Sequence, residues 1–263
     1  MAFTESIIAH FRRLENALNQ ALARLQDTTD TEALHDVRIN LRRIRSLRRI
    51  RSLLRPLRGT PGVAQLDNAA ASLGKLTTPI RDLEVLIAEL ARHPLEWQTN
   101  VRKTELQSRN LALASHPLLF RFPNLLHDWP KSFHKAKRRH AKRRVAHRLS
   151  RQVKQLRLAL ADGHYDRHRL RLLIKRLRYV TDAYPQFSLI TPEAAASLKE
   201  AQNALGDWHD RFVWCRQAEN QQDLWPLLPE WQDAQETALE RAEAALFALS
   251  RALTSKTRDA SRS

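Results

Sequence analysis

The feature that most constrains the fold is an internal repeat of a basic segment. Residues 35–45 read HDVRINLRRIR and residues 168–178 read HRLRLLIKRLR, so the segment recurs at an offset of 133 residues. The histidine, three arginines and one further Arg/Lys position coincide in the two copies. A second echo follows one predicted helix later, with RD at 81–82 and HD at 209–210. A period this long indicates a duplicated half of a domain rather than a solenoid.

The composition favours helices. Ala, Leu, Arg and Gln dominate, and five Gly in 263 residues leave little material for tight hairpins, so we expect an all-α fold. The single cysteine, Cys215, excludes an intramolecular disulfide framework and a Cys-based zinc cluster. No window approaches 18 uncharged apolar residues, and the first residues carry Glu and Arg where a signal peptide needs an apolar run. We therefore expect a soluble, cytoplasmic protein with no membrane insertion.

Apolar periodicity and stop signals predict eight helices in two sets of four. The predicted first set covers about residues 4–25, 31–55, 63–93 and 95–128, and the second set covers about 132–161, 165–184, 192–221 and 227–253. Asp30 or Thr31 is the expected N-cap of the second helix, and we expect a disturbance at Pro79 and a break at 116–118. Trp129-Pro130 is the expected boundary between the halves. The predicted parts are therefore residues 1–130, residues 131–253 and a flexible tail at 254–263.

The repeated segment separates charge from apolar surface when it is drawn as a helix. At 100° per residue, the cations of each copy form a stripe beside the apolar residues instead of opposite them. The first stripe, about 21 Å long, contains His35, Arg38, Arg42, Arg45 and Arg49. The second contains His168, Arg171, Lys175 and Arg178.

The overall charge points to a polyanionic partner. The chain has 45 Lys and Arg against 28 Asp and Glu, a formal net charge of +17, which destabilises a compact state unless counter-charge screens it. A solvated helix face is the simpler explanation for one basic stripe. It needs no fixed registry, however, whereas the two stripes keep theirs, and like charges at this spacing repel by a few tenths of a kcal/mol per pair. We therefore favour anion binding.

A third basic segment lies at residues 131–148, with nine Lys or Arg and three His. Extending the apolar stripe of this predicted helix backwards reaches Arg138 and Lys142. Charges on an inward-facing stripe indicate a wet basic cavity or channel, because burying them unpaired costs several kcal/mol each.

These motifs resemble the CHAD family (conserved histidine α-helical domain). The resemblance rests on H-x-x-R-x-x-x-[RK]-R-x-R in both halves, on RDLEVL at 81–86 and on L-K-x-x-Q-x-x-L-G-x-x-x-D at 198–210, and it covers about residues 4–253. It implies two four-helix bundles related by a pseudo-twofold axis, a basic groove or pore between them, and binding of inorganic polyphosphate, with association with polyphosphate granules. Two positions depart from the family pattern: Thr78 stands where the first half parallels Gly206, and His209 stands where the family often has Asn.

The resemblance and the stripes together predict the binding residues. Arginine suits a chain of phosphates because its guanidinium makes bidentate contacts to phosphate oxygens. The expected polyphosphate-binding residues are His35, Arg38, Arg42, Arg45, Arg49, Arg138, Lys142, His168, Arg171, Lys175 and Arg178, with Arg81 and Lys199. Asp82 and Asp210 are expected to orient basic residues or to cap helix ends. Reversing charge at both Arg38 and Arg171 is expected to abolish binding and to leave the helical circular dichroism signal intact.

Other classes of function remain as alternatives. Nucleic-acid binding is the chief one, and weak, non-specific binding follows from the charge alone. Aromatic residues are only 6% of the chain and none interleaves with the first stripe, while the six tryptophans are expected in core or inter-helix packing. A polyphosphate-processing enzyme is a second alternative. Because no Walker A motif, D-x-D pair or H-E-x-x-H motif is present, we expect no catalytic residue, cofactor or metal.

Overall fold

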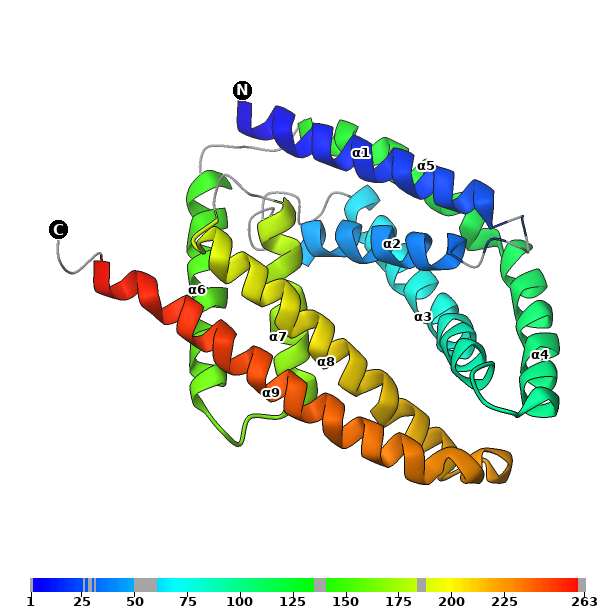
Figure 1. Cartoon of the computed structure of the whole chain (residues 1–263). Coiled ribbons are helices and arrows are strands. Elements are labelled where there is room, and N and C mark those ends of the chain that lie inside the picture. The colour runs from blue at the N-terminus through cyan, green and yellow to red at the C-terminus, as the bar shows by residue number, and fades with distance from the viewer. Residues whose placement is uncertain are drawn as a thin grey trace. The chain divides into compact units, whose positions relative to one another are not determined.

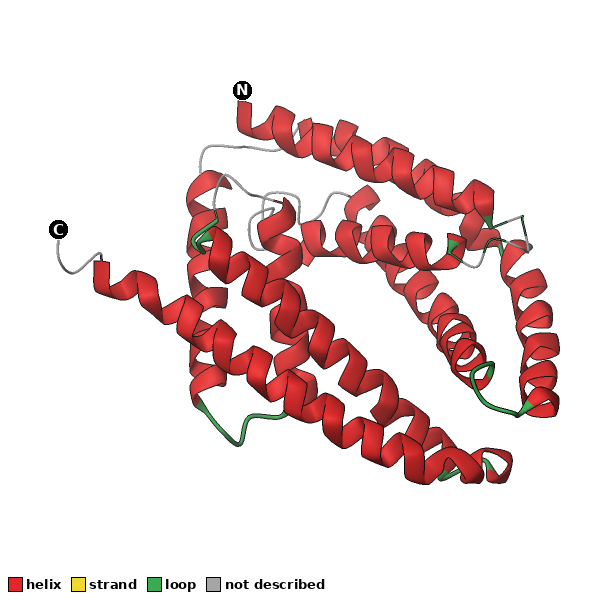
Figure 2. Ribbon diagram, in the orientation of Figure 1, coloured by secondary structure: helices red, strands yellow, loops and turns green. Residues whose placement is uncertain are grey.

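The computed structural model describes residues 2–25, 27, 30, 32–49, 61–134, 141–183 and 188–259. Every regular element within these ranges is a helix, which confirms the prediction of an all-α fold (Figure 2). The chain divides into two compact units, Met1–Arg144 (unit 1) and Val145–Ser263 (unit 2).

Unit 1 is built around α3, which packs against three other helices. Its helices are α1 (Ala2–Arg24), α2 (Ala33–Arg49), α3 (Pro61–Leu90), α4 (Glu96–Ala114) and α5 (Pro117–His134). Helices α2, α4 and α5 all pack against α3, while α1 packs against α2 and α5 (Figure 1). The buried core includes Phe11, Leu18, Val37, Leu73 and Phe122, which come from four of these helices. Burial of such side chains is the main force that holds the helices together.

Prolines mark the differences between the predicted and observed helices of unit 1. The break predicted at 116–118 is confirmed, because α4 ends at Ala114 and Pro117 starts α5. Helix α3 instead runs uninterrupted through Pro79. Pro79 is exposed, and so is Lys75, whose carbonyl loses its hydrogen-bond donor, so water can replace the missing bond. Helix α5 likewise continues through Trp129-Pro130 to His134. Residues 50–60, where we expected the second helix to end, lie outside the described residues.

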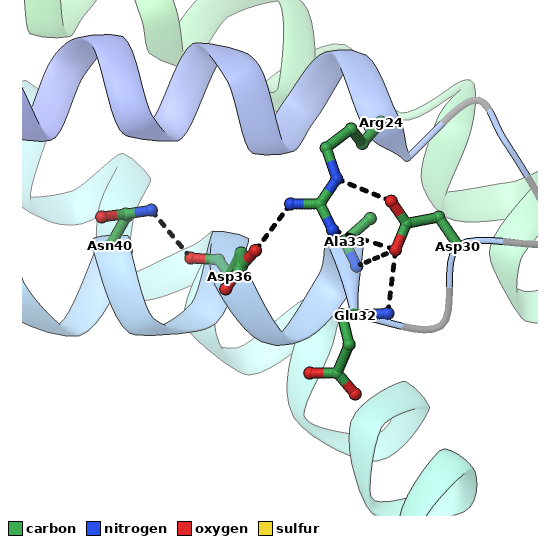
Figure 3. A network of polar contacts seen from close by, with 6 residues as sticks. All are labelled: Arg24, Asp30, Glu32, Ala33, Asp36 and Asn40. Atoms are coloured by element: carbon green, nitrogen blue, oxygen red, sulfur yellow. Dashed lines mark hydrogen bonds and ion pairs between the residues drawn. The ribbon is translucent and has the colours of Figure 1, made fainter.

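An ion-pair network fixes the start of α2 (Figure 3). The backbone N–H groups of Glu32 and Ala33 donate to one carboxylate oxygen of Asp30, each at 3.0 Å, so Asp30 caps the helix as one of the two predicted candidates. Arg24, the last residue of α1, donates to both oxygens of Asp30, at 2.6 and 3.0 Å, and to Asp36 at 2.6 Å. The hydrogen bonds from Arg24 hold the pKa of Asp30 below its usual value. The turn that carries His35 is thereby tied to α1.

Unit 2 contains most of α6 and three further α-helices. Its elements are α6 (Ala141–Ala161), α7 (Arg167–Ala183), α8 (Pro192–Ala218), the 3₁₀ helix η4 (Gln222–Leu227) and α9 (Leu228–Asp259). Helices α8 and α9 lie side by side and η4 joins them, while α7 packs against α8 (Figure 1). The buried core includes Leu156, Ile174, Leu205, Trp231 and Leu249.

Polar contacts define the ends of the helices in unit 2. Thr191 caps α8 by accepting a hydrogen bond from the backbone N–H of Ala194 at 3.1 Å, and Pro192 occupies the first turn, where proline is favoured. Arg167 at the start of α7 forms an ion pair with Glu243 of α9. Helix α9 continues to Asp259, so most of the predicted tail is helical. Helix propagation adds a hydrogen bond per residue without requiring burial, and the last residues, 260–263, lie outside the described part of the chain.

Within the described ranges, no helix combines the length and the apolar composition that crossing a bilayer requires.

Candidate functional site

The repeated segments lie on α2 and α7, and their apolar faces are buried as the helical pattern predicts. Leu34, Val37, Leu41 and Ile44 of α2 are each at most 3% exposed, and Leu170, Ile174 and Leu177 of α7 at most 1%. The cations beside them are therefore held at the edge of a core. Their side chains are partly or fully buried where the structure describes them.

Arg38 lies deeper than its place on the helical wheel indicates. It is only 8% exposed, and its Nη1 donates to the hydroxyl of Thr78 at 2.9 Å and to that of Thr77 at 3.3 Å, both on α3. Among the described residues, no acceptor reaches its Nε. Burial, followed by the charge of Arg42, lowers the pKa of Arg38 to about 10, although Asp82 and Glu84 act in the opposite direction. Arg38 is thus a charged group held between two helices by neutral hydroxyls.

Three more cationic or titratable side chains gather around Arg38. Burial and then the positive charge of Arg81 lower the pKa of His35, and Arg42 adds to that effect. Arg81 donates to a carboxylate oxygen of Glu84 at 3.0 Å. We call His35, Arg38, Arg42 and Arg81 the unit 1 cluster. It combines residues of α2 and α3.

The second repeat forms a cluster of different character on α7 and α8. The ring of His168 lies 4.7 Å from that of Trp208, 4.8 Å from Phe212 and 5.1 Å from His209, measured between centroids. Burial, then Arg171, then His168 and Lys175 lower the pKa of His209 to about 4. We call His168, Arg171, Lys175 and His209 the unit 2 cluster. In this cluster His168 is surrounded by other rings, whereas His35 in the unit 1 cluster is surrounded by charged side chains.

Within each unit, the repeated segment and the second echo lie close together in space. His35 of the first repeat is close to Arg81, and His168 of the second repeat touches His209, the counterpart of Arg81. The departure at Thr78 also has an explanation. A Cβ placed on Gly206 would meet no atom within 4 Å, so this position has room for a side chain. In unit 1 the corresponding position carries Thr78, whose hydroxyl accepts a hydrogen bond from Arg38.

Several predicted binding residues lie away from these clusters. Lys199 is exposed on α8, ten residues and therefore about 15 Å along the helix from His209. Arg178 lies one turn beyond the cluster residue Lys175 on α7, and its Nε is 3.9 Å from a carboxylate oxygen of Asp182. Arg45 and Arg49 belong to α2 and Lys142 to α6, but their side chains, like Arg138 as a whole, lie outside the described residues.

The two predicted orienting carboxylates occupy helix interiors. Asp82 lies within α3 and Asp210 within α8, so neither caps a helix end. Asp82 acts on Arg38 electrostatically, which agrees with the other expected role, that of orienting basic residues.

The sequence patterns did not single out the neutral and acidic side chains that surround the two clusters. Thr77, Glu84, Trp208 and Phe212 all contact or influence a cluster residue. Their spacing could have indicated them, because each lies within four positions of residue 81 or residue 209 on the same helix. Three of the tryptophans, Trp208, Trp214 and Trp231, are buried as expected, but Trp97 and Trp225 are exposed.

These helices and clusters define an all-α protein with a histidine and several cations partly buried in each of two units. The model of the CHAD domain matches residues 9–219, which include both repeats and both echoes. The chain therefore belongs to the CHAD domain family, as its motifs indicated.

A solved structure of the same family supports the fold. The crystal structure of the CHAD domain from the plant Ricinus communis is similar, with a TM-score of 0.68 over 95% of this chain and 91% of that chain, at 21% sequence identity. A search of curated proteins gave no match.

Proposed function

We propose that this protein binds inorganic polyphosphate and does not catalyse its turnover. The observation that carries the proposal is the partial burial of a histidine with several cations on the repeated helix of each unit. Membership of the CHAD family supports it, since polyphosphate binding is what the resemblance to that family implied.

The electrostatics of the clusters fit a polyanion. In the free protein, burial and neighbouring cations lower the pKa values of Arg38, His35 and His209. All three shifts mean that additional positive charge is unfavourable there without an anion. A phosphate chain would reverse that balance, because it supplies roughly one negative charge per phosphate where partial burial strengthens the attraction. Binding then offsets the unfavourable free energy of holding these cations close together.

The chemistry of the described side chains supports binding more than hydrolysis. Both clusters present guanidinium and imidazole groups, and Lys175 adds an ammonium group to the unit 2 cluster; all of these groups hold anions. The carboxylate in hydrogen-bond contact with the unit 1 cluster, Glu84, is engaged with Arg81.

The arrangement of the two units is also part of the proposal. We infer from the repeat that the units descend from a duplicated four-helix bundle and that both clusters line one basic groove. A flexible phosphate chain could then contact His35 and His168 together, which would favour long polyphosphate. Such a protein would be cytoplasmic and would associate with polyphosphate granules.

A competition titration tests the function. Labelled long-chain polyphosphate is bound at about 0.15 M salt and challenged with duplex DNA, RNA or heparin at equal charge. We expect polyphosphate to be preferred by tenfold or more, which is about 1.4 kcal/mol. Displacement in proportion to charge alone would instead identify a generic basic surface and refute the proposal.

Charge reversal can be matched residue by residue. We expect Arg42→Glu with Lys175→Glu to abolish binding, and the control to be Arg43→Glu with Arg176→Glu, which makes the same charge change at the next, exposed positions of α2 and α7. Reversal at Arg38 is a less suitable test. Arg38 is almost fully buried near Asp82 and Glu84, so a carboxylate there should also destabilise unit 1, and loss of binding would not be separated from loss of folding.

A further inference from the structure

The Arg81–Glu84 pair places a negative charge inside a cluster that otherwise collects positive ones. Both residues are on α3, three positions apart, and their side chains are 22% and 12% exposed. The guanidinium Nη1 of Arg81 is 3.0 Å from Oε2 of Glu84. Arg81 is therefore already occupied by an anion in the free protein.

Glu84 is placed where a carboxylate is costly. Burial raises its pKa, and the nearby Glu32 adds to that effect, while Arg81 on its own helix and Arg38 on α2 oppose it. Glu84 in turn acts on Arg38. Its charge thus partly neutralises two residues of the unit 1 cluster, at a site partly screened from water.

Unit 2 has no carboxylate at the corresponding position. Glu84 follows Arg81 by three residues, and the residue that follows His209 by three is Phe212. The Phe212 ring contacts that of His168 at 4.8 Å. The position three residues after the echo is therefore acidic in unit 1 and aromatic in unit 2.

We propose that Glu84 is an internal competitor for Arg81, which a phosphate oxygen must displace when the unit 1 cluster binds its ligand. This inference rests on the proposed binding of polyphosphate. It makes Glu84 a residue that sets the affinity of the unit 1 cluster.

The test compares two variants on one helix. Glu84→Gln removes the competing charge and keeps the shape of the side chain. Glu89→Gln is the matched control, because Glu89 also lies on α3, is 13% exposed and accepts from an arginine three residues later, Arg92, at 3.4 Å. Both changes raise the net charge by one. With long-chain polyphosphate at about 0.15 M salt, we expect the dissociation constant of Glu84→Gln to be at least threefold lower than that of Glu89→Gln.

A second measurement follows protons instead of affinity. A displaced Glu84 beside a polyanion becomes easier to protonate, so near pH 5 it should add to the protons that His35 and His209 take up on binding. Calorimetry in two buffers of different ionisation enthalpy measures this uptake, and Glu84→Gln should take up less than Glu89→Gln. Equal affinities and equal uptake in the two variants would refute the role of Glu84 and leave polyphosphate binding intact. Absence of binding by the wild type would refute the function itself.

Discussion

Replacing Arg38 by methionine is expected to stabilise the free protein and to weaken its binding of polyphosphate. Burial lowers the pKa of Arg38 to about 10, which corresponds to a cost of about 3 kcal/mol for keeping this group charged in the fold. Below pH 10 this cost is present in full, and it falls only as the pH rises above 10. Replacing buried ionic groups by apolar side chains of similar volume is often neutral or stabilising by about 1–4 kcal/mol.

The surroundings of Arg38 favour this outcome. The hydroxyls of Thr77 and Thr78 also donate to the carbonyls of Leu73 and Gly74, at 2.8 and 2.7 Å. They therefore keep hydrogen bonds when the guanidinium is removed, and no buried hydroxyl is left unsatisfied. Methionine is flexible enough to fill the vacated space.

Urea unfolding of the whole chain and hydrogen exchange of the amides in α2 and α3 measure the gain in stability. Arg43→Met removes the same charge from an exposed position of the same helix and is the control. Loss of a charged hydrogen bond to phosphate, about 1.5–3 kcal/mol, predicts binding weaker by tenfold or more. If Arg38→Met is less stable than the control, or binds polyphosphate equally well, the reasoning about Arg38 is refuted.

Two further predictions concern unit 2. Thr191→Ala removes the cap of α8 and should lower the free energy of unfolding by about 1 kcal/mol, whereas Thr191→Ser should keep the cap. Urea unfolding followed by circular dichroism measures both variants, and an equal loss of stability in the two would contradict the role of the cap. The pKa of His209 is lowered to about 4, so stability should fall as the pH drops from 6.5 through 4, because the unfolded state then binds the proton more readily. After allowance for solvent screening the loss is about 1–2 kcal/mol, and thermal unfolding at pH 6.5 and 4.5 should show a smaller loss in His209→Asn than in a control, His164→Asn, at an exposed loop position.

Local rules were sufficient for most of the helices. The cap at Asp30, the cap region at Thr191-Pro192 and the break before Pro117 all follow from the preferences of single residues. The rules were less reliable for prolines inside helices, since α3 continues through Pro79. Whether a proline interrupts a helix depends on what replaces the lost hydrogen bond, and exposure at that point is a tertiary property.

The sequence predicts which face of each helix carries the site, but not how deeply each side chain is buried. A helical wheel shows that Arg38 borders the apolar face of its helix, but its burial depends on α3, which supplies Thr77 and Thr78 across the interface. Likewise, nothing in the α7 segment indicates that His168 contacts Trp208 and Phe212. Contacts between elements far apart in sequence determine whether a residue is a ligand group, a counter-charge or a packing partner.

The contact between His168 and Trp208 gives the unit 2 cluster an optical signal of its own. The indole is 6% exposed and its ring centre lies 4.7 Å from that of the imidazole. An anion that enters this cluster changes the surroundings of the indole. The difference in emission between the wild type and Trp208→Phe should therefore report on the unit 2 cluster against the background of the other five tryptophans.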